Sequence, residues 1–258
     1  MKILIGMETS GEIRRAFAAR GWHAVSVDLL PSDDVPSCGP WRTQQHWIGD
    51  VRDFIARDWD MFIFHPDCTY LTCSAEWAYK DVQTKKLKPG TLYGKKRRQA
   101  RAEAIDFVLD LWDRSKHIPK RCMENPIGAL STAFRKPNQI IQPNQFGEDA
   151  SKATCLWLDG LKPLQIDPKK YIEPRMVCKR CRRTFAYGLA GKGCPHCGAE
   201  GGSALPRWAN QTDSGQNRLP PSAERWRLRA KTYPGIANAM ALQWGAGQGL
   251  RTGGTIDE

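Results

Sequence analysis

Two kinds of hydrophobic pattern alternate in the first part of the chain. Continuous apolar runs at Lys2–Met7, Ala24–Leu29 and Asp60–His65 are each short enough to predict a buried strand. Between the first two runs, the apolar positions of residues 12–20 recur at helical spacing, and Gly21 is a typical end for such a helix. Buried strands that alternate with helices are typical of βαβ units. The pattern therefore predicts an α/β fold with a mainly parallel sheet.

The later pattern is more broken. It predicts a helix over residues 96–115, a further buried strand at Ala153–Leu158, and helices at 223–231 and 236–244. Residues 31–45 are rich in Pro, Ser and Asp and predict a loop. The predicted organisation is a core at 1–170, a cysteine-containing insertion at 171–205, a helical return to the core at 206–245 and a flexible tail at 246–258.

Charge adds a prediction about partners. The chain carries 39 Lys and Arg against 27 Asp and Glu, a formal net charge of +12. Residues 80–121 hold 13 basic and 5 acidic side chains, a local net charge of +8. A localised basic segment favours a polyanion such as nucleic acid, with a general solubility charge as the alternative. The candidate nucleic-acid contacts in this segment are Lys85, Lys86, Lys95, Lys96, Arg97, Arg98 and Arg101.

Four of the nine cysteines stand in the spacing C-x2-C-x12-C-x2-C. They are Cys178, Cys181, Cys194 and Cys197. Two such pairs can hold one zinc ion in a closed, structural site, and reduced thiols without a metal are the alternative. The basic residues between the pairs, including Arg180 and Arg183, favour contact with nucleic acid, although the ribbon can also serve stability alone.

Three positions in the core are candidates for chemistry. Thr9-Ser10-Gly11 follows the first strand and precedes a helix, and Asp28 closes the second strand, as in nucleotide-binding α/β folds. An ordinary βα turn is the alternative. Cys68 follows the third strand, and Glu124 follows another strand-like run. Both can face one crevice at the carboxyl ends of the strands. A thiol paired with an acid suits attack on an electron-poor heterocycle, and simple packing of Cys68 is the alternative.

In their order along the chain, these segments resemble the DNA cytosine-5 methyltransferases, and in particular the small phage-type members. The resemblance lies in Glu8-Thr9-Ser10-Gly11, Asp28-Leu29-Leu30-Pro31, Asp50, His65-Pro66-Asp67-Cys68-Thr69-Tyr70-Leu71, Glu124-Asn125-Pro126-Ile127-Gly128 and Pro234-Gly235-Ile236-Ala237-Asn238-Ala239-Met240-Ala241. It covers nearly all of residues 1–165 and returns at 218–245.

The resemblance implies a class I, Rossmann-like methyltransferase fold that uses S-adenosylmethionine, here with an inserted zinc ribbon. It implies that Cys68 attacks carbon 6 of a flipped cytosine, that Glu124 acts on ring nitrogen 3, and that the methyl group passes to carbon 5. Asn125 and Lys152 complete the implied catalytic set. The implied cofactor contacts are Glu8, Thr9, Ser10, Gly11, Asp28, Leu29, Asp50 and Pro66.

The sequence departs from the family at several points. The glycine-rich turn is reduced to Thr9-Ser10-Gly11, Pro-Cys-Gln becomes Asp67-Cys68-Thr69, and only one cation, Lys152, stands where the family has two arginines. A ribbon replaces the large target-recognition domain. Two alternatives therefore stay open: a catalytically silent DNA-binding module, or the same chemistry on a cytosine nucleotide or RNA.

The expected surroundings follow from composition. No apolar run approaches the roughly 20 residues of a membrane helix. The first residues show no signal-peptide pattern, and the number of cysteines is odd, which favours reduced thiols over disulfides. We expect a cytoplasmic protein of a bacterium or a phage-infected cell, with duplex or single-stranded DNA as its partner and no membrane. A monomer is favoured, with the oligomeric state undetermined.

Overall fold

The computed structural model describes residues 1–34, 44–81 and 89–245. It divides them into two compact units. The first unit contains the described residues within 1–139, residues 155–164 and residues 237–245. The second contains Ile140–Thr154 and Gln165–Ile236. The second unit is thus larger than the insertion predicted at 171–205, because segments on both sides of the ribbon pack with it.

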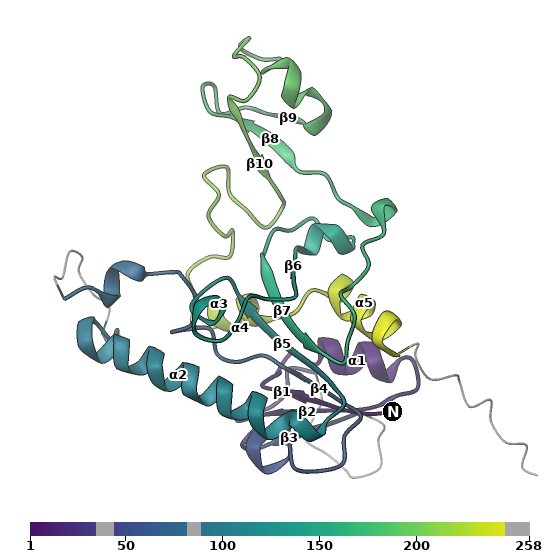
Figure 1. The fold of residues 1–258 in the computed structure, drawn as a ribbon. Coiled ribbons are helices and arrows are strands. Elements are labelled where there is room, and N and C mark those ends of the chain that lie inside the picture. The colour runs from purple at the N-terminus through teal and green to yellow at the C-terminus, as the bar shows by residue number, and fades with distance from the viewer. Residues whose placement is uncertain (35–43, 82–88, 246–258) are drawn as a thin grey trace, which may run out of the picture. The chain divides into compact units, whose positions relative to one another are not determined.

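Six strands of a seven-stranded sheet form the centre of the first unit (Figure 1), and most of the seventh, at residues 139–141, belongs to the second unit. The order of the sheet is β3-β2-β1-β4-β5-β7-β6. The strands are β1 (Lys2–Gly6), β2 (His23–Asp28), β3 (Gln44–Ile48), β4 (Met61–Phe64), β5 (Lys120–Pro126), β6 (Gln139–Ile141) and β7 (Thr154–Asp159). The pairs β1–β2, β1–β4, β2–β3 and β4–β5 are parallel. The predicted α/β class with a mainly parallel sheet is confirmed.

Two helices cover opposite faces of this sheet. The connection from β1 through α1 (Glu12–Ala18) to β2 and the connection from β4 through α2 (Gly94–Arg114) to β5 run in opposite directions across the sheet. Because such connections are right-handed, α1 and α2 lie on opposite faces. On the α2 face, its Val108 and Leu111 join the buried cluster of Leu4, Val25, Phe62, Phe64 and Trp157.

The helix α5 (Pro234–Gly245) completes the first unit beside α1. Its Met240 and Ala241 are fully buried. Arg20, just after α1, donates to Asn238 Oδ1 at 3.4 Å, and Trp244 Nε1 donates to the Lys162 carbonyl at 2.9 Å. The last helix of the chain is therefore part of the core that the first strands build.

The second unit has its own three-stranded antiparallel sheet, ordered β10-β8-β9. These strands are β8 (Arg175–Cys178), β9 (Thr184–Ala186) and β10 (Ala204–Arg207). Two further helices are short: α3 (Leu130–Ala133) in the first unit and α4 (Arg225–Ala230) in the second. No helix within the described ranges has both the length and the apolar character needed to cross a membrane.

Two sequence predictions need correction. The predicted loop 31–45 gives way at Gln44 to β3, an edge strand without a continuous apolar run. The predicted helix 223–231 is shorter, because α4 starts only at Arg225. The tail predicted at 246–258 lies outside the described residues.

Candidate functional site

The strand order reverses between β1 and β4, and the candidate residues follow these strands. In open α/β sheets, ligands bind outside the carboxyl ends of the strands at such a reversal. Glu8 to Gly11 follow β1, Cys68 follows β4, and Glu124 lies in the last part of β5, which pairs with β4. The sheet therefore brings the three predicted segments to one edge.

The loop that carries Cys68 is fastened to the segment after Glu124 at both of its ends. At one end, Asn125 Nδ2 donates to the Pro66 carbonyl at 2.7 Å. At the other end, Thr72 forms an isolated bridge with Gly128, and the Ala129 amide donates to the Leu71 carbonyl at 2.7 Å. A Cβ atom on Gly128 would lie 1.9 Å from the Leu71 carbonyl oxygen, so only glycine allows this approach.

Cys68 itself sits in a turn held by its neighbours. The Asp67 carboxylate accepts from the Thr69 amide at 2.9 Å and from its hydroxyl at 2.7 Å. The Cys68 carbonyl accepts from the amides of Leu71 and Thr72 at 3.1 and 3.0 Å. Cys68 is partly exposed. The thiol is thus held in an ordered loop at the surface rather than packed in the core.

Glu124 is buried and paired with a histidine that the sequence analysis did not select. His65 Nδ1 lies 2.5 Å from Glu124 Oε2, and both side chains are close to nine-tenths buried. The pairing follows from the register of the sheet, in which Phe64 is opposite Met123, so that the next residues on the two strands are His65 and Glu124.

Glu8 is a second buried carboxyl at this edge. Its Oε1 accepts from the Ile13 amide at 2.8 Å and from the Ser10 hydroxyl at 3.3 Å. Burial raises the pKa of Glu8 above its ordinary value, and this outweighs the lowering by His65 and the Ile13 amide. The Oε2 atom of Glu8 and the Nε2 atom of His65 are buried and have no hydrogen-bond partner in the described part of the chain.

The other cysteines of the first unit differ from Cys68 in their surroundings. Burial, together with the Glu124 charge, raises the pKa of Cys155 to about 11 and raises the pKa of Cys122 well above its ordinary value. Both thiols are therefore protonated at neutral pH and packed in the core. Cys73 is exposed on the same loop as Cys68, which makes it a matched control for substitution.

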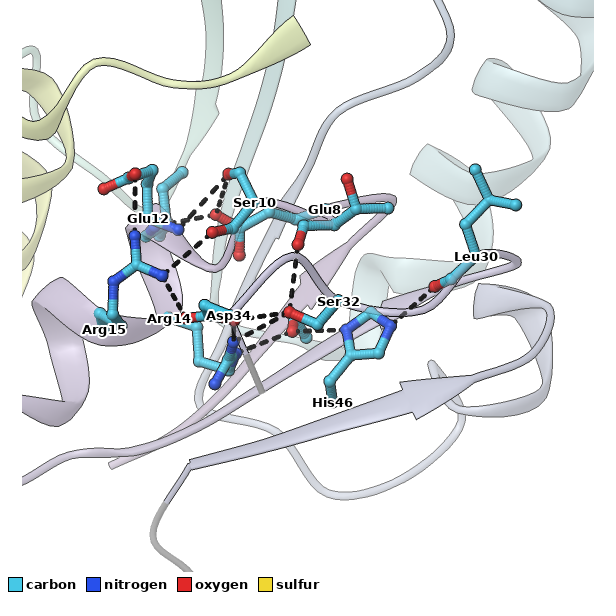
Figure 2. A network of polar contacts seen from close by, with 12 residues as sticks. Glu8, Ser10, Glu12, Arg14, Arg15, Leu30, Ser32, Asp34 and His46 are labelled. Atoms are coloured by element: carbon cyan, nitrogen blue, oxygen red, sulfur yellow. Dashed lines mark hydrogen bonds and ion pairs between the residues drawn. The ribbon is translucent and has the colours of Figure 1, made fainter. Parts of the chain in front are cut away.

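The turn after β1 is filled by charged side chains (Figure 2). Arg14, which is fully buried, donates to Ser26 Oγ at 2.9 Å and to Asp34 Oδ1 at 2.5 Å, and Arg15 pairs with the same Asp34. Gly11 has φ of 67°, and a Cβ there would lie within 2.6 Å of both Asp34 carboxylate oxygens. The predicted Thr9-Ser10-Gly11 turn is present, with Asp34 lying against it.

The acids after β2 and β3 have different environments. Asp28 Oδ1 accepts from the Leu30 amide at 2.9 Å, and its neighbour Leu29 is 72% exposed. Ile48, at the end of β3, is 57% exposed. Asp50, in contrast, is held by Arg52, whose side-chain hydrogen bonds lower the pKa of Asp50. The Asp50 carboxylate is therefore already engaged within the chain.

The four cysteines of the second unit come together in a cluster that could hold a metal ion, as their spacing predicts. Their sulfur atoms all lie within 4.8 Å of one another. Cys178 Sγ and Cys197 Sγ are 3.8 Å apart, and Cys181 Sγ and Cys194 Sγ are 3.6 Å apart. A tetrahedron with Zn–S bonds of about 2.3 Å has edges of about 3.8 Å. The thiols thus fit a metal ion such as zinc. His196 lies between Cys194 and Cys197 in the sequence, and its Nε2 is 3.1 Å from the Thr184 carbonyl oxygen.

The chain matches no protein-family model. No curated protein matches it either.

The predicted nucleic-acid contacts fall into two groups. Arg97 and Arg101 point inward: Arg97 is buried over the rings of Tyr70 and Tyr79, and Arg101 donates to the Tyr70 carbonyl at 2.8 Å and the Thr72 carbonyl at 3.2 Å. These two arginines therefore brace the loop of Cys68.

The remaining basic residues are more exposed. Arg98 donates to the Tyr79 carbonyl at 2.7 Å and pairs with Asp81, with a half-exposed side chain. Four other predicted contacts are also exposed: Lys95, Lys96, Arg180 and Arg183. Lys85 and Lys86 lie outside the described residues.

Lys152, predicted as catalytic, belongs to the second unit. Its ammonium donates to the Lys231 carbonyl at 3.1 Å and to the Ala230 carbonyl at 3.5 Å, at the carboxyl end of α4. This position gives Lys152 a capping role in its own unit.

Proposed function

We propose that the chain is an S-adenosylmethionine-dependent transferase that methylates cytosine at carbon 5 in DNA. The observation that carries the proposal is the fastening of the Cys68 loop to the Glu124–Gly128 segment at both ends. It holds a partly exposed thiol and a buried carboxyl at one edge of a doubly wound sheet, where ligands of such folds bind.

The two side chains suit the two halves of the reaction. The Cys68 thiolate adds to carbon 6 of the cytosine, and the electron pair of the ring is displaced toward nitrogen 3. Glu124 donates a proton to nitrogen 3 and so offsets the developing charge. Carbon 5 becomes nucleophilic and is methylated. Water, acting as a base, then removes the carbon-5 proton, and the electron pair of that C–H bond restores the double bond and expels the thiolate.

The cofactor, when bound, supplies the methyl group. Three observations favour adenosine and a cationic amine at this edge: the carboxylate of Asp28, the exposed apolar side chains of Leu29 and Ile48, and the buried Oε2 atom of Glu8 that has no hydrogen-bond partner in the described residues. These residues would hold the cofactor. Asp50 departs from the expected set because it pairs with Arg52.

Two further features support the proposal. The mainly parallel sheet, whose order reverses between β1 and β4, is compatible with the Rossmann-like fold that the proposal requires. The exposed Lys95 and Lys96 lie in the first turn of α2, and Arg101 of the same helix contacts the Cys68 loop. A DNA phosphate bound by these lysines would therefore contact the helix that supports the Cys68 loop. Because a cytosine in a duplex is stacked, the enzyme flips it out of the helix before the thiol reaches carbon 6. Zinc, held by the four cysteines, stabilises the ribbon.

The deciding experiment is incubation with S-adenosylmethionine and duplex DNA that contains cytosine in all sequence contexts, followed by mass spectrometry of the nucleosides. We expect 5-methylcytosine with the wild type and with Cys73→Ser, and a loss of about 1,000-fold or more with Cys68→Ser. DNA that contains 5-fluorocytosine should form a covalent adduct with the wild type and none with Cys68→Ser. No modified cytosine on any DNA, with the cofactor bound, contradicts the proposal.

A silent DNA-binding module is the second candidate. It is favoured by the pairing of Asp50 with Arg52 and by the Asp34 carboxylate against Gly11, both of which fill positions expected for a cofactor. Such a module binds DNA equally well with and without S-adenosylmethionine and forms no adduct. A cytosine nucleotide as substrate is separated by salt, since only binding to DNA weakens steeply as salt rises.

A further inference from the structure

His65 lies among buried carboxyl groups at the carboxyl edge of the sheet. Its Nδ1 is 2.5 Å from Glu124 Oε2, and its charge acts on Glu8, whose carboxyl is also buried. The opposite ring nitrogen, Nε2, is buried and has no hydrogen-bond partner in the described residues, and the same holds for Glu8 Oε2. The imidazole is largely shielded from water, and a hydrogen bond in such surroundings is stronger than one in bulk solvent.

We propose that His65 is a positioning residue for Glu124, which fixes one carboxyl oxygen and shares the proton that Glu124 passes to the cytosine ring. The inference rests on the proposed function, because it assigns a role within that reaction. It adds a residue to the site that lies 59 positions from its partner in the sequence.

The position of His65 is set by the sheet and not by a mobile loop. Phe64 ends β4 and pairs with Met123 of β5. The residues that follow them, His65 and Glu124, therefore lie opposite each other. Pro66 follows His65 and is fastened by Asn125, the residue after Glu124. The histidine and the carboxyl are thus held by hydrogen bonds before and after the pair, which suits a preorganised proton donor.

The proton balance of the step is simple. When the Cys68 thiolate adds to carbon 6, Glu124 loses one proton to nitrogen 3 of the ring. The proton on His65 Nδ1 moves toward Oε2 as the carboxylate forms. When carbon 5 is methylated and the thiolate leaves, the proton on nitrogen 3 returns to the pair. The pair therefore loses and regains one proton per turnover. The methyl group comes from S-adenosylmethionine, and the carbon-5 proton passes to water as the base.

Other titratable groups surround the pair and define what the pH dependence reports. Glu8 follows β1, and Arg14 of α1 acts on it. Cys122 of β5 and Cys155 of β7 feel the charge of Glu124. The two thiols are protonated at neutral pH, and the carboxyls that lie close to His65 are those of Glu8 and Glu124.

Two substitutions separate holding from proton sharing. In His65→Asn, the side-chain amide nitrogen takes the place of Nδ1 and keeps the donor to Glu124, but it cannot titrate. In His65→Gln, the amide takes the place of Nε2 and the donor to Glu124 is lost. We expect methyl transfer to fall about 10-fold in His65→Asn, with a flattened pH profile, and about 100-fold in His65→Gln. Cofactor affinity and melting temperature should change little in His65→Asn.

The control is His117→Asn, since His117 also makes two hydrogen bonds, to the carbonyls of Arg114 and Ile55, but lies away from the strand ends. It should keep the wild-type rate and pH profile. A His65→Gln variant with the wild-type rate and pH profile overturns the inference.

A second measurement does not depend on activity. The chain has only 5 histidines, so the ring nitrogens of a ¹⁵N-histidine-labelled protein can be assigned with single His→Asn variants. Glu124→Gln should shift the Nδ1 resonance of His65 and leave that of His117 unchanged. If His65 does not respond, the inference fails whatever the activity. If His65 responds but no cytosine is modified, the proposed function fails and the proton-sharing pair stands.

Discussion

Each of the two units is stabilised internally by different contacts. The carboxyl edge of the first unit is fixed by backbone contacts such as Leu71 against Gly128, over a large core in which the strands contribute fully buried Leu4, Phe62 and Phe64. The small sheet of the second unit rests on a core of five buried residues. These are Met176, Cys178, Phe185, Cys194 and Ala199, and two of them are thiols of the metal site.

The difference shows where a protein can dispense with a metal. Burial of apolar surface stabilises the first unit by roughly 25 cal/mol per Å², and its core is large enough for this to suffice. The ribbon buries too little, so its four thiols are the main restraint. The candidate site residues Cys68 and Glu124 lie in the first unit, whose core forms without a bound ion.

Removal of the metal should produce the largest difference in stability between the two units. Binding of structural zinc to such sites is worth on the order of 10 kcal/mol, so a chelator should unfold β8 to β10 and leave β1 and β4 intact. Hydrogen exchange read out by peptide mass spectrometry checks this: ribbon peptides should exchange at once and core peptides should stay protected. Re-addition of zinc should restore protection. Protected β8 amides after complete metal loss contradict the comparison.

Gly128→Ala tests the backbone fastening in the first unit. The added Cβ would collide with the Leu71 carbonyl, so we expect a loss of about 1–3 kcal/mol in the free energy of unfolding and a displaced Cys68 loop. Chemical denaturation and adduct formation on 5-fluorocytosine DNA measure the two effects. Gly188→Ala in the second unit, where a Cβ meets nothing within 4 Å, is the control. Equal stability of the two variants speaks against the fastening.

The basic residues of α2 allow residues that support the Cys68 loop to be compared with residues proposed to bind DNA. Arg101→Ala removes hydrogen bonds to two loop carbonyls, and a loss of about 1–3 kcal/mol in stability is expected. Lys96→Ala, on the same helix but exposed, should leave stability within about 0.5 kcal/mol of the wild type. It should instead lower the slope of log DNA affinity against log salt by about 1. Unchanged salt slopes in both Lys95→Ala and Lys96→Ala remove this surface from the DNA contact.

Two acids near α1 should respond to pH with opposite signs. Burial raises the pKa of Glu8 above its unfolded value, so its stabilising contribution is present below about pH 4.5 and is lost as pH rises through the folded pKa. Burial also acts on Asp34, but hydrogen bonds from Ser32 and Arg15 outweigh it and lower its pKa. Its contribution is present above pH 3.8 and is lost on acidification.

Glu8→Gln should therefore stabilise the protein at neutral pH, with the gain disappearing near pH 4. Asp34→Asn should destabilise it at neutral pH, with the loss shrinking in acid. Urea unfolding at several pH values measures both. Parallel pH dependence of the two variants would contradict the assigned environments.

The sequence was a good guide wherever one local signal sufficed. Continuous apolar runs predicted β1, β2 and β4, and cysteine spacing predicted the metal site. The edge strand β3 was missed because its polar residues form no such run. His46 there faces Ser26 of β2 at 2.9 Å, a contact that exists only once the strands pair.

Other features of the site depend on long-range pairing. The contact of His65 with Glu124 comes from the register of β4 and β5, which a single sequence does not specify. Charge counting likewise could not separate Arg97 and Arg101, which fold back onto the Cys68 loop, from the exposed Lys95 and Lys96. Cys68 and Glu124 were selected from the strand pattern, whereas Asp50, Asn125 and Lys152 and all the specific roles rested on the resemblance and remain predictions.

The return of the chain to its first unit affects the order in which the protein folds during synthesis. The chain leaves the first unit after Leu164 and comes back only at Ala237, in α5. A ribosome has therefore made the whole second unit, with its four cysteines, before the buried side chains of Met240 and Ala241 exist to close the core. All four thiols are therefore made while the core of the first unit is still incomplete. A metal ion that they bind during translation would be taken up before the first unit completes its folding, not after it.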